Sequence, residues 1–497
     1  MKKIVVVGAG IAGLSAAIYL QRSGFEVTIC EQGSNAGGSF SSWERGGYTF
    51  EGALEWLGGS NPSTELYQLW KETGAFDDST AIDFLDPYHC VLYEGQIVSL
   101  YRDIDTTARH LLAISPEDSQ HIRLMAKDVK KLSKIKMPPF NIRGVKIHNP
   151  RRICPAKYIP MLPGLIRLLF LNKISCRDYV EKFKHPALQK SFDIIRSYFR
   201  ATNLIFTMGT MHAGDGGYPE GGSRGIIQRM IAAFEGLGGK LLFHTPVHKV
   251  NITYGSKKPA LGHVTGVTLG DKTLAADAVI VTQETLAALE HLFERPLEDA
   301  WLQKLQKSAK SSVCTFIGVG IRAEIPDAPV PEWQLTEPIT YVGETITEIG
   351  FFNHNRHGYA PKGCTVLTSR LRRDTYDNWK KAREEGRYEE EKRALADAVS
   401  REICLRYPQA RGNIEVIDIA TPLTYERYTG AYRGSWMSIT SAGDPIKIYP
   451  GLVKNVKGLY FAGFRLIPPG GVPAALLSGR RAAQMVCRQF KTVFKAT

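Results

Sequence analysis

The sequence has no run of about 20 uncharged apolar residues, the length that a helix needs to cross a bilayer, so we do not expect an integral membrane protein. Its eight cysteines form no Cys-x-x-Cys pair, and none lies near a histidine at zinc-finger spacing, which fits free thiols in a reducing compartment. Repeats and low-complexity segments are absent too. With 43% hydrophobic and 23% charged residues, the 497-residue chain is predicted to form two or three globular domains.

Acidic residues are scarce relative to basic ones: 49 Asp and Glu against 63 Lys and Arg give a formal net charge of +14. Residues 121–157 hold most of this excess, with eleven Lys or Arg and a single acid, Asp128. The apolar stretch 161–171 follows, too short to span a bilayer but able to dip into one. We therefore expect a cytoplasmic protein that docks peripherally on an anionic membrane surface. A solvated basic face is the alternative, and nucleic acid is disfavoured because no nucleic-acid motif is present.

The first 31 residues carry a dinucleotide-binding pattern. Residues 3–7 are predicted to be a buried parallel strand, 11–23 a helix and 26–31 a second strand. The intervening G-x-G-x-x-G allows a tight turn, close approach of a pyrophosphate and close helix packing, through Gly8, Gly10 and Gly13 in turn. Glu31 ends the second strand, where a carboxylate accepts hydrogen bonds from a ribose diol and disfavours the 2′-phosphate of NADP.

Two glycine-containing patterns have competing interpretations. The lysines at 2 and 3, followed by an apolar run, resemble the start of a secretory signal, but the glycines and a poor cleavage site favour the folded motif. Residues 318–323 match G-x-G-x-x-A, yet the prolines at 326, 329 and 331 prevent a helix from starting there. We predict a strand of a second domain at this position and no second nicotinamide-binding motif.

The order of the predicted elements implies an α/β fold with a discontinuous Rossmann-like domain. Its three parts are residues 1–75, 216–295 and 415–497, and the last part closes with a helix over 472–490. The intervening parts, 76–215 and 296–414, are predicted to form a mixed-sheet substrate domain, with a helical basic lid in the first of them. Within the second, the dense mixed charge of residues 380–406 predicts a solvated helix.

Three groups of motifs give the chain a family resemblance. It resembles FAD-dependent phytoene desaturases, carotenoid isomerases and retinol saturase, within the broader flavin amine oxidase superfamily. The first group is the N-terminal pattern with Gly37-Gly38 and residues 46–52, and the second is residues 218–222 with 238–239, 247 and 276–280. The third is residues 458–463 with 469–473 and 478–479, and residues 421–427 look like the carotenoid-isomerase branch in particular.

The resemblance implies an FAD molecule extended across the nucleotide domain. FAD is expected to be noncovalent because residues 463–478 contain no Cys or His to tether it. A helix beginning at Val472-Pro473 would direct its positive end at the reduced flavin. The implied cofactor-binding residues are Gly8, Gly10, Ile11, Ala12, Gly13, Glu31, Gln32, Gly38, Ser39, Phe40, Ser41, Val247, Gly463, Phe464, Gly471, Val472 and Pro473.

Two of these residues depart from the family pattern. Ser39 stands where the family commonly has Arg, and Phe464 stands where it commonly has Asp. Both positions normally contact the cofactor, so the ribityl and pyrophosphate contacts are expected to differ here. Arg465 is a candidate for the missing charge, with a surface role as the alternative.

The implied activity is FAD-dependent redox chemistry on carbon–carbon double bonds of a lipophilic polyene or isoprenoid, by desaturation, saturation or isomerisation. An amine oxidase on the same fold and a non-catalytic flavin or lipid carrier are the alternatives. Tyr425 and Arg427 are the catalytic candidates, and Trp436 is a further candidate for the flavin face. No metal site is expected, because His354 and His357 lack accompanying carboxylates or cysteines and are predicted to lie in a solvated loop.

Overall fold

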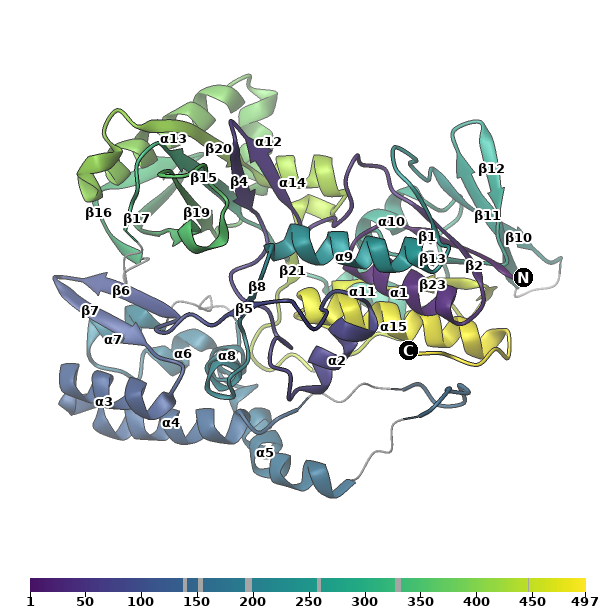
Figure 1. The fold of residues 1–497 in the computed structure, drawn as a ribbon, viewed down its shortest axis with the longest axis horizontal. Helices are drawn as coiled ribbons and strands as arrows, with labels where there is room; N and C mark the ends of the chain where they lie inside the picture. The colour runs from purple at the N-terminus through teal and green to yellow at the C-terminus, as the bar shows by residue number, and fades with distance from the viewer. Residues whose placement is uncertain (137–140, 151–154, 193–198, 257–260, 327–331, 446) are drawn as a thin grey trace.

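Five parallel strands from distant parts of the chain form the sheet on which the nucleotide pattern sits (Figure 1). The computed structural model describes the chain except for residues 137–140, 151–154, 193–198, 257–260, 327–331 and 446. The strand order is β23-β13-β1-β2-β9, and the predicted strands at 3–7 and 26–31 are confirmed. The bounds are β1 Lys3–Val7, β2 Glu26–Cys30, β9 Lys240–Leu242, β13 Ala278–Val281 and β23 Leu459–Phe461.

Both faces of this sheet are covered, as the near-continuous apolar strands require. One face packs against α1 (Ile11–Arg22), α9 (Gly222–Gly236) and α15 (Val472–Gln489), which confirms the predicted closing helix. The other face packs against α10, α11 and a four-stranded layer, in which β10, β11 and β12 are antiparallel and β22 (Val456–Lys457) pairs in parallel with β11. The bounds are α10 Thr285–His291, α11 Ala300–Ser308, β10 Lys249–Tyr254, β11 Gly262–Leu269 and β12 Lys272–Ala275.

Two further four-stranded sheets lie beyond the nucleotide sheet. Their orders are β18-β19-β15-β20 and β17-β16-β6-β7. The predicted strand at 318–323 is confirmed, because Gly318 and Gly320 belong to β15 and face the rings of Phe50 and Tyr48, which a Cβ at either glycine would approach within 2.7 Å. The bounds are β6 His89–Tyr93, β7 Gln96–Leu100, β15 Thr315–Ile321, β16 Glu332–Tyr341, β17 Glu344–Gly350, β18 Phe352–Asn353, β19 Thr365–Leu371 and β20 Ile414–Ala420.

Helices form the layer below these sheets in Figure 1. Their shared core includes Ile122, Val129 and Leu204. The structure describes no helix long and apolar enough to cross a membrane in the residues that it covers. The bounds are α3 Ile104–Ile114, α4 Ser119–Leu132, α5 Leu162–Leu171, α6 Cys176–Val180, α7 Pro186–Ser191 and α8 Ala201–His212.

The prediction of one solvated helix over 380–406 is wrong. The segment contains parts of two helices, α12 (Tyr376–Glu384) and α13 (Tyr388–Arg406), separated at Gly386, whose φ of +74° favours glycine. Each helix buries an apolar face against β16 and its neighbours, with Trp379 and Leu395 fully inside. The many charged residues lie on the outer faces of these two helices. The composition of the segment did not reveal that each helix also has a buried apolar face.

Candidate functional site

The glycine-rich turn joins β1 to α1 in a conformation that needs its glycines. Gly8 has a φ of +104°, and a Cβ at Gly13 would overlap the carbonyl oxygen of Gly8. Gly10 is the N-cap of α1 and gives the first turn no side-chain hydrogen bond, so the backbone N–H groups from Ile11 onward have no side-chain cap. A Cβ at Gly10 would meet nothing closer than 3.6 Å, so its absence leaves room for a ligand. Ala12 lies in the same first turn.

Glu31 lies at the end of β2, directly beside this turn. Its two carboxylate oxygens accept hydrogen bonds from the backbone N–H groups of Ala9 and Gly33, both at 2.8 Å. A carboxylate has further acceptor positions, which a ribose hydroxyl can use. The backbone of Thr245 donates to the carbonyl oxygen of Glu31, which brings the half-buried Val247 segment to the same edge.

Residues 37–41 form a second tight turn against the first. Gly37 donates its backbone N–H to Ala9, and Gly38 has a φ of +58°. The Ser41 hydroxyl donates to the carbonyl oxygen of Gly38 at 3.0 Å, while Phe40 is buried and Ser39 is partly exposed between them. On the other side, the amide of Gln32 lies next to Gly430, at the end of α14 (Pro422–Thr429).

The N-terminus of α15 forms the third part of the expected flavin site. Gly471 is its N-cap with a φ of +86°, and no side chain caps the first turn, which begins Val472-Pro473. The backbone N–H of Gly463 bonds to the hydroxyl of Ser478 at 2.8 Å. The Phe464 ring packs against Gly470, where a Cβ would lie 3.0 Å from it. Two uncapped helix ends, positive-φ glycines and a terminal carboxylate fit a bound dinucleotide.

Arg465 has neither of the roles expected for it. It is fully buried and forms an ion pair with Glu284, whose carboxylate also caps α10. Its guanidinium donates to the hydroxyls of Ser311 and Ser435, both at 2.8 Å. The surface alternative is therefore wrong, and the charge of Arg465 is used in the protein core, where an unpaired guanidinium would be costly.

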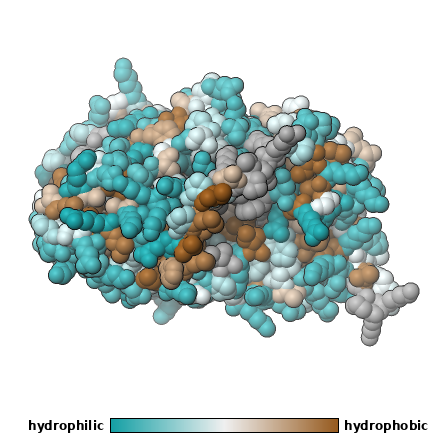
Figure 2. Space-filling view, turned by 90° about the horizontal axis from the view of Figure 1, so that it is seen from below, coloured by the Kyte–Doolittle hydropathy of each residue, from teal (hydrophilic) through white to brown (hydrophobic). Residues whose placement is uncertain are grey.

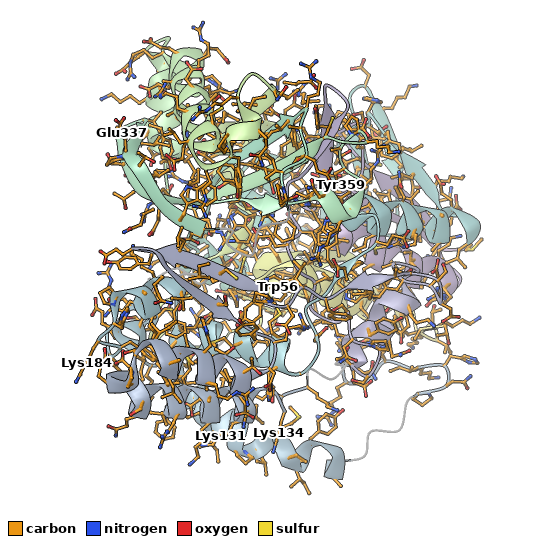
Figure 3. The ribbon with its side chains drawn as sticks, turned by 60° about the vertical axis from the view of Figure 1, so that its left-hand side comes forward. Trp56, Lys131, Lys134, Lys184, Glu337 and Tyr359 are labelled. Atoms are coloured by element: carbon orange, nitrogen blue, oxygen red, sulfur yellow. The ribbon has the colours of Figure 1, made fainter. Side chains whose placement is uncertain are left out.

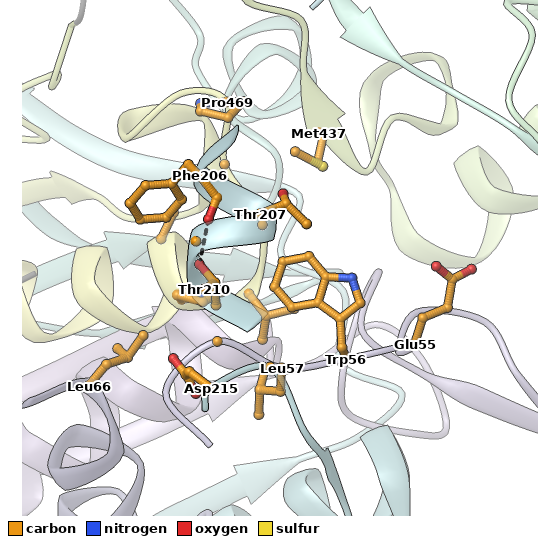
Figure 4. A pocket seen from close by; sticks show the side chains of 18 of the residues that line it. Glu55, Trp56, Leu57, Leu66, Phe206, Thr207, Thr210, Asp215, Met437 and Pro469 are labelled. Carbon is orange, nitrogen blue, oxygen red and sulfur yellow. Dashed lines mark hydrogen bonds between the residues drawn. The ribbon is translucent and has the colours of Figure 1, made fainter. Parts of the chain in front are cut away.

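A cavity of about 2020 Å³ extends along one face of α15, from Gly470 at its N-terminus to Arg488 near its C-terminus. Figure 4 shows the loop of Glu55, Trp56 and Leu57 on one side and α8 on another. Trp56 lies between the upper sheets and the lower helices (Figure 3). The apolar lining residues include Leu57, Leu66, Leu85, Ile135, Met161, Leu165, Leu168, Phe206, Met211, Ile346, Phe351, Leu452, Ile467, Leu477 and Met485.

A charged cluster interrupts the apolar wall. Glu55 bonds to Arg370 at 2.8 Å and to Arg372 at 3.3 Å. Burial raises the pKa of Glu55, but the two guanidiniums outweigh burial and hold that pKa below its ordinary value. Burial also lowers the pKa of the neighbouring His89 to about 4, so this imidazole is neutral at pH 7. No motif predicted this cluster; the one signal was an acid in the apolar run 53–57.

The catalytic candidates Tyr425 and Arg427 both lie on α14. Tyr425 is directed at the carbonyl oxygen of Gly52, 3.4 Å from its hydroxyl, and burial raises its pKa well above the ordinary value. The Arg427 side chain is exposed and lies over the ring of Tyr428. Neither Tyr425 nor Arg427 lines the cavity. Trp436 does line the cavity, and its indole nitrogen is buried without a hydrogen-bond partner among the described residues.

The prediction of a solvated loop for the two histidines is wrong. His354 is 1% exposed and its Nε2 lies 3.0 Å from the hydroxyl of Thr368, while the His357 ring stacks on Tyr218 at 3.8 Å. They pack in an aromatic cluster that also includes Phe352 and Tyr359. The described part of the chain contains no group of three His, Cys, Asp or Glu side chains arranged to hold a metal ion.

Comparison with known proteins places this architecture. The family described as flavin containing amine oxidoreductase matches residues 11–487. A 1-hydroxycarotenoid 3,4-desaturase from Flavobacterium sp. is 24% identical over 98% of this chain and 99% of its own. A chloroplastic prolycopene isomerase 2 from an Oncidium hybrid cultivar is 23% identical over 97% of this chain and 83% of its own. The solved cyclohexylamine oxidase of Brevibacterium oxydans shares the fold, with a TM-score of 0.60 at 16% identity and 99% coverage of both chains.

Proposed function

The chain belongs to the flavin containing amine oxidoreductase family, and from that premise we propose that it is an FAD-dependent oxidoreductase acting on carbon–carbon double bonds of a lipophilic polyene or isoprenoid. Desaturation, saturation and isomerisation are all included in this proposal. The similarity to a carotenoid desaturase and a carotenoid isomerase over nearly the whole chain supports the substrate class. When bound, FAD supplies hydride exchange with a substrate carbon.

The observation that carries the proposal is the cavity along α15. It begins at Gly470 to Pro473, where the flavin is expected, and continues between largely apolar walls. At 1.5 Å per residue, the helix face from Val472 to Arg488 is about 24 Å long. Such a wall can bury a long apolar chain, at roughly 25 cal/mol for each Å² removed from water. It would also fix one carbon–carbon unit beside the flavin and exclude water. A short amine would leave most of this space unfilled.

The chain's own groups would then bind and orient rather than exchange protons. The α1 N-terminus would hold the pyrophosphate and Glu31 the ribose, while the α15 N-terminus would face the flavin. Glu55 stays ionised between its two arginines, so it serves as a fixed negative group in the wall. Tyr425 supports the Gly52 turn and thereby the wall of the site.

Membrane docking is a second part of the proposal. Leu162, Leu165, Ile166, Leu169 and Phe170 of α5 are between 40% and 59% exposed, an unusual set for one short helix. Figure 2 shows apolar side chains gathered on the face seen from below, on the side where Figure 1 places α5. Lys131 and Lys134, labelled at the lower edge of Figure 3, lie next to this helix. Of the predicted basic residues, Arg151 and Arg152 lie outside the described residues.

The test is anaerobic spectroscopy of the purified flavoprotein with a panel of polyenes, unsaturated lipids and primary amines. We expect a polyene or isoprenoid to change the flavin spectrum and to yield a product with altered double bonds. Rapid flavin reduction by simple amines, without any response to the lipids, would establish the amine oxidase alternative. Binding of lipids without any conversion would establish the carrier.

A further inference from the structure

The far end of the cavity, near the C-terminus of α15, is basic. We define the basic rim as Arg143, Lys447, Arg481 and Arg488, all of which line the cavity. The Arg488 guanidinium donates to the carbonyl oxygen of Arg143 at 3.1 Å. The Arg481 guanidinium donates to the carbonyl oxygen of Tyr449 at 3.3 Å, and Tyr449 follows Lys447 by two residues. The four residues therefore come from three segments that are in contact along α15 and line the same cavity.

The positive charge of the basic rim is uncompensated by the described residues. None of its four members forms an ion pair there, whereas the adjacent Arg480 lies 3.7 Å from Glu72 and also bonds to Asn141. The Nε atom of Arg481 is buried and has no hydrogen-bond partner among the described residues. Burial and the charge of Arg488 both lower the pKa of Arg481. An unpaired buried donor of this kind is costly unless a ligand satisfies it.

We propose that the basic rim binds the phosphate group of a phosphorylated isoprenoid or polyene lipid, whose chain extends along α15 toward Val472. The arginine fork matches phosphate oxygens in geometry, and a phosphate monoester carries a charge of about −1.5 to −2 at pH 7. A single carboxylate would neutralise only one of the four positive charges, so a phosphate monoester matches the basic rim better. The proposal rests on the proposed function in one respect only, namely that the end of the lipid chain near Val472 is the end that reacts.

The spacing along α15 suits such an amphiphile. Arg481 is about 14 Å and Arg488 about 24 Å from Val472 along the helix axis, at 1.5 Å per residue. Leu477 and Met485 line the cavity from the same helix, and Leu165 and Leu168 line it from α5. The phosphate would lie where Arg143 and Arg488 are exposed to water, and the chain would be buried between these apolar side chains.

The experiment measures binding by the purified holoprotein, without turnover. Geranylgeranyl phosphate and geranylgeraniol, differing only in the phosphate, are titrated below their aggregation concentrations by equilibrium dialysis. We expect the phosphate ester to bind at least about tenfold more tightly, the lower limit for charge-assisted hydrogen bonds, and added salt to reduce the difference. Arg481→Gln with Arg488→Gln should abolish the preference, whereas Arg401→Gln on the exposed face of α13 should retain it.

Two further arms identify the source of the phosphate and guard against misfolding. Inorganic phosphate should compete only weakly, and phosphatidic acid vesicles should bind without displacing the ester. Equal affinity for the ester and the alcohol would overturn the proposal and leave the basic rim facing bulk solvent. Displacement of the ester by the phosphatidic acid vesicles would also overturn it and would assign the basic rim to a bilayer headgroup. If the double variant fails to fold, Arg143→Gln with Arg488→Gln, both exposed, gives the same decision. Failure of the redox proposal would leave this binding preference intact.

Discussion

Gly13 illustrates how one absent side chain holds the nucleotide turn together. A Cβ there would overlap the carbonyl oxygen of Gly8 and approach the hydroxyl of Thr282 within 2.9 Å. We expect Gly13→Ala to destabilise the protein by about 1–3 kcal/mol, the usual cost of overpacking, and to weaken flavin retention. Thermal unfolding and the flavin-to-protein absorbance ratio measure the two effects.

Gly236→Ala is the matched control for that substitution. Gly236 ends α9, and a Cβ there would meet nothing within 4 Å, so stability should be unchanged or slightly raised by the better helix propensity of alanine. If both variants unfolded at the wild-type temperature and retained flavin equally, close packing at Gly13 would not be what holds the turn.

Glu55 has a pH-dependent part in stability. Its pKa in the folded chain lies below the ordinary value of 4.5, because Arg370 and Arg372 favour the ionised form. Its stabilising contribution is therefore fully present above about pH 4.5 and is lost as the pH falls through the lower, folded value. We expect Glu55→Gln to lower the melting temperature at pH 7 and the deficit to shrink toward pH 4.

The control for that titration is Glu390→Gln, at an exposed position in the first turn of α13. At pH 7 its melting temperature should stay close to that of the wild type, without the deficit expected for Glu55→Gln. A deficit for Glu55→Gln that stayed constant from pH 7 to pH 4 would show that the ion pairs with the two arginines do not stabilise the fold.

At the scale of elements, α5 exposes more large apolar side chains than any other described helix. Arg167 pairs with the buried Asp128 at 2.7 Å, and Gly164 packs closely against the backbone of α4. One side of α5 is thus fixed to α4, while Leu162, Leu165, Ile166, Leu169 and Phe170 remain exposed. An arrangement of this kind is stable in solution and leaves the apolar side available to a membrane.

We expect Leu162→Ser, Ile166→Ser and Phe170→Ser together to reduce binding to anionic vesicles by tenfold or more, because each removes apolar area worth roughly 1.5 kcal/mol or more on burial. The folded state should lose little stability, since these side chains are already exposed. Cosedimentation with vesicles measures the loss. Leu405→Ser, equally exposed on α13, should bind as the wild type does, and unchanged binding by the triple variant would contradict docking through α5.

At the scale of the whole molecule, the flavin site draws on both ends of the chain, with α1 and α15 side by side. No Cys or His lies between Gly463 and Ser478 to tether a flavin there. We expect acid precipitation to release intact FAD into the supernatant, measured by its absorbance and mass. Added FAD should also raise the melting temperature of the flavin-depleted protein, because a ligand that binds only the folded state stabilises it. Flavin retained in the pellet would demonstrate a covalent link instead.

Local pattern was sufficient for the nucleotide half of the site. The spacing of the glycines in residues 8–13 predicted the turn, and Val472-Pro473 predicted the helix start. The strand end at Glu31 followed from the strand–turn–helix–strand order of the first 31 residues. The same reasoning failed for His354 and Arg465, because their burial depends on partners such as Thr368 and Glu284 that are distant along the chain.

The sequence by itself determined the class of fold and the nucleotide-binding pattern, since both follow from periodicity, glycine placement and capping over short stretches. Only the tertiary structure decided what lines the cavity. Glu55 meets Arg370 across 315 positions, and Arg481 meets the segment of Lys447 across more than thirty. Such meetings depend on how sheets and helices pack, and side-chain charge becomes chemically informative only when packing has removed the water around it.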